Sequence, residues 1–127
     1  MKENDLEIWI AHAEDDFNAA TKLLRGKKPS IYGACFHAQQ CAEKYIKAML
    51  VFKGKRFPMT HDLVNVNNLL QQVKIDLKTS DDILELLSSY AVRARYSGEL
   101  PEMADAKEAL EIAKKIRLFS RKFLGLK

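Results

Sequence analysis

The chain has 127 residues and a formal net charge of +4, with 47% hydrophobic residues, 30% charged residues, five glycines and three prolines. This length and composition exclude disordered and fibrous classes and predict one domain, over residues 1–127, that needs no metal or disulfide to fold. No apolar run approaches the roughly 20 residues of a membrane span, and the acidic N-terminus does not resemble a signal peptide. We therefore expect a soluble cytoplasmic protein without a membrane partner.

The first half of the chain predicts two long helices. Apolar residues spaced three and four apart run from Leu6 to Leu24, and Gly26 then ends the helix. Ser30 is a suitable N-cap for a second helix, whose apolar face runs to Met49 and which Gly54 ends.

The second half predicts three further helices. Thr60 is the expected cap of a short helix that extends to Val73, and Thr79 and Asp82 have the spacing of a capping box for a fourth helix. The apolar face of that helix is expected to contain Ile83, Leu86, Leu87 and Tyr90. A fifth helix covers residues 106–123. No segment alternates as a strand would, so we predict an all-α, up-and-down bundle of about five helices with a four-helix-bundle-like core.

Known catalytic and metal-binding templates are missing from the sequence. It contains no glycine-rich phosphate loop, no His-Glu-x-x-His pair and no Gly-x-Ser-x-Gly turn. Cys35 and Cys41 lie six residues apart in one predicted helix, which places them on different faces and favours two buried, unpaired thiols. We expect no metal and no cofactor.

The positive charge is concentrated in one part of the chain. Residues 17–56 contain nine basic residues and one acidic residue. This excess favours an anionic partner, although lysines also cover the solvated faces of many helices. The sequence leaves open whether the basic loop Lys53–Arg56 contacts nucleic acid.

Four polar residues of the second helix share one face because of their spacing. These are Gln40, Glu43, Lys44 and Lys47. The pattern allows two interpretations. The face is either solvated, with Glu43 and Lys47 as a surface ion pair, or it forms a polar groove that binds a ligand or a partner subunit.

A second candidate site is the start of the third helix, at Thr60-His61-Asp62. A helix N-terminus attracts anions through its backbone N–H groups and its dipole. Asp62 is also explained as a residue that complements the dipole, and His61 as a structural hydrogen-bonding residue.

A third candidate site is Arg93, Arg95 and Tyr96, at the end of the fourth helix. Arginine suits bidentate binding of phosphate, and a tyrosine ring can stack on a base. The alternative is that the two cations only complement the C-terminus of the helix.

These blocks resemble the HEPN domain family, whose name refers to higher eukaryotes, prokaryotes and nucleotide binding. The second-helix block is Phe36–Ala48, with His37-Ala38-Gln39-Gln40 and Glu43-Lys44-Tyr45-Ile46-Lys47 inside it. Thr60-His61-Asp62-Leu63 and the later block Arg93-Ala94-Arg95-Tyr96 follow in the order typical of the family. The resemblance covers nearly the whole chain and implies a helical bundle that usually forms homodimers.

The resemblance implies one of two roles. Small prokaryotic members often accompany a minimal nucleotidyltransferase and take part in nucleotide binding, whereas others are metal-independent ribonuclease toxins. The ribonucleases use an arginine, an adjacent polar residue, and a histidine four to six residues further on. No histidine follows Arg93 or Arg95 here, because the histidines are His12, His37 and His61.

The sequence therefore favours a nucleotide-binding or anion-binding module that is not itself catalytic and that pairs with a minimal nucleotidyltransferase, in a toxin–antitoxin-type pair. The predicted ligand-binding residues are those of the three sites, namely Gln40, Glu43, Lys44, Lys47, His61, Asp62, Arg93, Arg95 and Tyr96. One alternative is a ribonuclease acting on RNA through Arg95 and His61. The other is a purely structural protein that uses the polar face for dimerisation.

Overall fold

The computed structural model describes the backbone of residues 3–96 and 100–127 and the side chains of residues 5–90 and 100–127. Within these residues the chain forms five helices and no strand. They are α1 (Glu3–Leu23), α2 (Ile31–Phe52), α3 (Leu63–Gln72), α4 (Asp81–Tyr96) and α5 (Met103–Phe123). The predicted all-α class is confirmed. No helix in this part of the chain is long and apolar enough to cross a bilayer.

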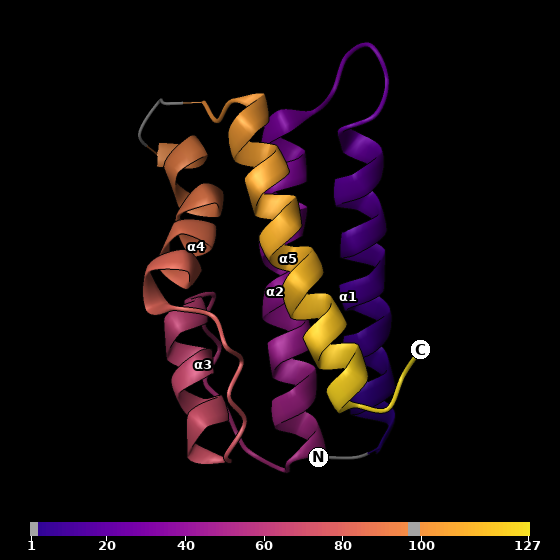
Figure 1. The fold of residues 1–127 in the computed structure, drawn as a ribbon, viewed down its shortest axis with the longest axis vertical. Helices are drawn as coiled ribbons and strands as arrows, with labels where there is room; N and C mark the ends of the chain where they lie inside the picture. The colour runs from indigo at the N-terminus through magenta and orange to yellow at the C-terminus, as the bar shows by residue number, and fades with distance from the viewer. Residues whose placement is uncertain (1–2, 97–99) are drawn as a thin grey trace.

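The helices are arranged around α2, which contacts each of the other four (Figure 1). The long helices α1 and α5 run alongside α2. The two shorter helices α3 and α4 follow one another lengthwise on the remaining side, so together they occupy the fourth position of a bundle. As a result, α2 is covered on most of its circumference, including parts of its polar face.

Small side chains allow α1 and α2 to approach closely. Ala13 and Ala20 of α1 and Ala34, Ala38 and Ala42 of α2 are almost completely buried. Cys35 and Cys41 are buried in the same core and form no disulfide, which confirms the interpretation of the cysteines. Larger side chains, among them Ile46, Met49 and Leu50, fill the rest of the core. Each contributes roughly 1.5–3 kcal/mol relative to an exposed position.

The buried face of α4 differs from the prediction by one residue. Leu84 is fully buried, whereas Ile83, predicted to be buried, is 41% exposed. The buried residues Leu84, Leu87 and Tyr90 are spaced three residues apart along α4. The prediction instead placed Ile83 on the buried face together with Leu86 and Leu87.

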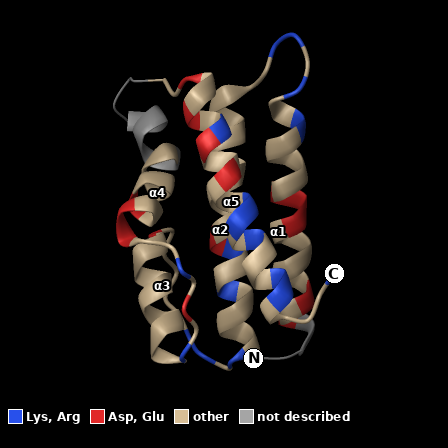
Figure 2. Ribbon diagram, in the orientation of Figure 1, with Lys and Arg blue, Asp and Glu red and all other residues tan. Residues whose placement is uncertain are grey.

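The helix ends follow simple electrostatic and steric rules. Gly26 and Gly54 have positive φ angles, +88° and +69°, at the two predicted stops. In α5, Asp105 lies in the first turn, and Arg121 and Lys122 lie in the last turn, as the helix dipole favours (Figure 2). Two predicted caps were wrong. The α4 cap is Ser80, whose Oγ accepts from Ile83 N at 3.3 Å, and not Thr79. The α3 cap is Asp62 and not Thr60, and it lies at the candidate site.

Candidate functional site

The candidate site is the polar face of α2, between α1 on one side and the segment that leads into α3 on the other. At its centre lies a buried carboxylate, that of Glu43. Its Oε2 accepts from Lys47 Nζ at 3.1 Å, and its Oε1 lies 2.8 Å from Nδ1 of His61. The Glu43 and Lys47 side chains are only 4% and 6% exposed, whereas that of His61 is 80% exposed.

The solvated-face interpretation is therefore wrong for Glu43 and Lys47. Both are covered because the segment before α3 packs against α2, and Lys47 Nζ donates to the Thr60 carbonyl at 2.9 Å. The same contacts orient His61. Since an ionised carboxylate only accepts hydrogen bonds, this contact favours the His61 tautomer that carries its proton on Nδ1. The geometry presents an oriented imidazole that can bind a ligand or exchange a proton.

Two neighbouring glutamines extend this network. Gln39 is completely buried, and its Nε2 donates to Glu43 Oε1 and to the His61 carbonyl, each at 3.2 Å. Gln40 is partly exposed and donates to Gln39 Oε1 at 2.7 Å. Sequence reasoning selected Gln40 and left Gln39 out of the site. The i,i+4 spacing of Gln39 and Glu43 was the available signal for including it.

The other edge of the face is organised by an α1 residue that the sequence analysis missed. Asp16, nearly buried, lies 2.7 Å from His37 Nδ1 and accepts from Lys44 Nζ at 2.5 Å. His37 and Lys44 are seven residues apart, two turns of one helix face, and both reach the same carboxylate. The spacing of His37 and Lys44 was visible in the sequence, but their partner on another helix was not.

The N-terminus of α3 is capped within the protein. Asp62, not the predicted Thr60, is the N-cap, and its side chain accepts from Val64 N at 3.0 Å and Asn65 N at 3.4 Å. Thr60 Oγ1 instead accepts from Asp62 N at 3.1 Å, and Leu63 N donates to Ser88 Oγ. The N–H groups at the start of α3 are thus already bonded. His61, beside this cap, has an 80% exposed side chain, and Asp62 is exposed as well but is occupied as the cap.

An aromatic pair lies beside Lys47. Trp9 of α1 and Phe57 of the α2–α3 segment meet edge to face, with ring centroids 5.7 Å apart. Lys47 Nζ lies 5.6 Å from the Trp9 ring centroid and 5.5 Å from that of Phe57. The site thus combines an imidazole, buried charges and an indole. The residues described include no group of His, Cys, Asp or Glu arranged to hold a metal ion.

A third charged cluster lies between α1 and α5. Arg117 donates to both carboxylate oxygens of Glu14, at 2.7 and 2.8 Å, and the hydroxyl of Tyr45 donates to the same carboxylate. The hydrogen bond from Arg117 lowers the pKa of Glu14, against the opposing effect of burial. Burial, and then the bond to Glu14, raise the pKa of Tyr45. This cluster ties the helices together and supplies no free group to the polar face.

The family assignment rests on a model that covers most of the chain. The HEPN domain model matches residues 6–123. The chain belongs to the HEPN family. This confirms the resemblance seen in the residue blocks of the second helix, the third helix and the end of the fourth.

Three known proteins are similar to this HEPN chain. It is 32% identical over 82 residues to Putative toxin MJ1304 of Methanocaldococcus jannaschii, covering 64% of this chain and 52% of that protein. The crystal structure of TT1696 from Thermus thermophilus matches with a TM-score of 0.70 and 27% identity, over 94% of this chain and 98% of that one. ST0689, an archaeal HEPN homologue of known crystal structure, matches with a TM-score of 0.65 and 25% identity, over 97% and 98%. This HEPN chain thus spans about half the length of the curated relative it matches.

The third predicted site of the HEPN chain falls outside the described side chains. The structure does not describe the side chains of Arg93, Arg95 and Tyr96, so their placement relative to the polar face stays a prediction. The structure does bring together Gln40, Glu43, Lys47 and His61. Lys44 lies on the same face, in the neighbouring Asp16 network.

Proposed function

We propose that this chain is a nucleotide-binding HEPN module, a homodimer that acts with a minimal nucleotidyltransferase in a toxin–antitoxin-type pair. The observation that carries the proposal is the exposed His61 imidazole, held by the buried Glu43 carboxylate beside Lys47. A buried charged network that fixes one exposed polar group is expensive to maintain for stability alone. It is expected where that group must meet a ligand in a defined orientation.

In this proposal the predicted ligand-binding residues have different roles. Lys47 is already bonded to Glu43 and to the Thr60 carbonyl, so its role is to hold these two groups in place. His61 and the partly exposed Gln40 and Lys44 are the groups that can reach a ligand. Asp62 caps α3 and shapes the rim of the site. In this proposal Arg93 and Arg95 hold phosphates.

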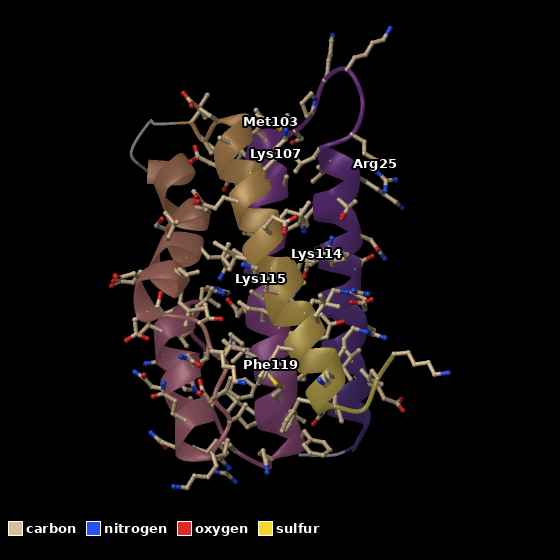
Figure 3. The ribbon with its side chains drawn as sticks, viewed as in Figure 1. Arg25, Met103, Lys107, Lys114, Lys115 and Phe119 are labelled. Carbon is tan, nitrogen blue, oxygen red and sulfur yellow. The ribbon has the colours of Figure 1, made fainter. Side chains whose placement is uncertain are left out.

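Calorimetric titration with ATP and GTP tests nucleotide binding. The wild-type chain is expected to bind at least one of them, and Glu43→Gln and His61→Ala are expected to bind more weakly. Lys114→Ala is the matched control, because Lys114 is an exposed lysine of α5 (Figure 3). The absence of binding at millimolar nucleotide, with the partner nucleotidyltransferase present, would contradict the proposal.

The second candidate function is a metal-independent ribonuclease. It is favoured by the oriented and exposed His61, since an imidazole can move a proton, and by the toxin name of the archaeal relative. Cleavage of total RNA in the presence of EDTA, abolished in both His61→Ala and Arg95→Ala, would establish this activity. RNA that remains intact would exclude it under those conditions.

The homodimer of the proposal is tested separately from binding. Light scattering should give the mass of two chains for the wild type. If the polar face is the subunit interface, as in the structural alternative, Gln40→Ala with Glu43→Ala should reduce that mass to one chain. If the face is a ligand site, the mass should not change.

A further inference from the structure

Trp9 is the only tryptophan of the chain, and its position differs from those of the core aromatics. Phe57, its neighbour, packs against the buried core. Trp9 is half-buried. In the part of the chain that the structure describes, the partly buried side chains that pack against that core do not include Trp9. Its ring makes a T-shaped contact with that of Phe57, at an interplanar angle of 74°, and lies below the Lys47 ammonium group.

These contacts hold the indole on the side of Phe57 and Lys47. Lys47 is immobilised by Glu43 and the Thr60 carbonyl, and its Nζ lies 5.6 Å from the ring centroid. A buried cation at this distance attracts the negative face of an indole. Because the two rings meet edge to face, Phe57 contacts the indole without stacking flat on it. The indole is thus preorganised beside the carboxylate that holds His61.

From this arrangement we infer that Trp9 is the base-stacking residue of the site, with Phe57 and Lys47 as its support. The inference rests on the proposed nucleotide binding and adds the residue that recognises the base. An indole offers a large apolar face, and a nucleobase has a π-face of similar size, so the two stack. The sequence analysis had given this role to Tyr96.

The charge nearby fits the rest of a nucleotide. Lys55 and Arg56 directly precede Phe57 in the chain, and Arg56 is exposed. His61 follows Phe57 by four residues and is also exposed. If the base of a nucleotide stacks on Trp9, the phosphates of that nucleotide would lie beside side chains that carry positive charge or donate hydrogen bonds. The basic loop Lys53–Arg56, whose role the sequence left open, then belongs to the phosphate side of the site.

The fluorescence of the single tryptophan tests this inference directly. Titration with ATP should quench Trp9 emission in a saturable way, after correction against free tryptophan in the same solutions. Inorganic triphosphate has the charge but no base, so it should bind more weakly and leave the emission unchanged. Since stacking on an aromatic ring changes binding by roughly 5- to 150-fold, Trp9→Leu should weaken ATP affinity within that range, and Trp9→Phe should weaken it less.

The matched control is Phe119→Leu, which removes a half-buried aromatic ring of α5 (Figure 3) and should leave ATP affinity unchanged. If the wild type binds ATP by calorimetry but Trp9→Leu binds it equally tightly, the inference is overturned and the proposed function stands. Unchanged Trp9 emission on ATP binding, measured in the wild type alone, overturns it even if Trp9→Leu does not fold. If the wild type binds no nucleotide, the proposed function itself fails.

Discussion

Glu43 and Lys47, one turn apart on α2, form an ion pair of 3.1 Å whose two side chains are almost completely withdrawn from solvent. Most i,i+4 pairs lie on solvated faces and contribute a few tenths of a kcal/mol. This pair is covered by the segment that leads into α3, and each partner makes one further hydrogen bond with that segment, Lys47 with Thr60 and Glu43 with His61. It therefore couples α2 to the entry of α3.

Lys47→Met is expected to destabilise the protein by about 3–5 kcal/mol, because it leaves the buried Glu43 carboxylate without its cation. Chemical denaturation with urea measures the change. Lys114→Met, at an exposed lysine of α5, should change stability by less than about 0.5 kcal/mol. Adding Glu43→Gln to Lys47→Met should recover part of the loss. A double variant as unstable as Lys47→Met alone would contradict the assigned cause.

Asp62→Ala is expected to cost about 1 kcal/mol, since it removes the side chain that accepts from Val64 N and Asn65 N. Asp62→Asn keeps an oxygen acceptor and should cost less. Thr60→Val, which removes a single exposed acceptor of Asp62 N, is the control and should also cost less than Asp62→Ala. Urea unfolding of the three variants gives the order. A larger loss in Thr60→Val would support the cap predicted from the sequence.

The sequence predicted which residues of α2 share a face, but it could not predict what covers that face. The spacing of Gln40, Glu43, Lys44 and Lys47 follows from helical geometry alone. The burial of Glu43 and Lys47 depends on the path of the segment before α3, and the pairing of Lys44 depends on Asp16 of another helix. These are tertiary contacts that no local pattern contains.

Helix positions were predictable for a related reason. The apolar spacing of α1, α2 and α5 extends over several turns, so its period is unambiguous. Caps depend on a single residue, and the errors at Thr60 and Thr79 were shifts of two residues and one residue. At both places several capping residue types are adjacent, and only the backbone path decides which side chain reaches the free N–H groups.

Both cysteines are expected to resist modification in the native protein. Cys35 and Cys41 are fully buried, and burial, as the main cause, raises the pKa of the Cys41 thiol. Because the thiolate is the reactive form, alkylation at mildly alkaline pH should be slow until the chain unfolds. Mass spectrometry after a pulse of iodoacetamide should find no label in the native protein and two labels in urea. Rapid labelling of Cys41 in buffer would contradict the buried position.

Glu14→Gln is expected to lower stability most at neutral pH and least in acid. Arg117 donates two hydrogen bonds to the Glu14 carboxylate, and the main consequence is a folded-state pKa below the ordinary value of about 4.3. A lowered folded-state pKa stabilises the protein fully above the unfolded-state pKa. That contribution is lost as the pH falls through the folded-state pKa.

The free energy of unfolding of the wild type should therefore exceed that of Glu14→Gln by about 1–3 kcal/mol at neutral pH, and the difference should shrink below about pH 4. Urea unfolding across this range measures it. Glu111→Gln, at an exposed position of α5, should show little difference at any pH. A Glu14→Gln difference that stays constant into acid would show that Arg117 does not act through the charge of Glu14.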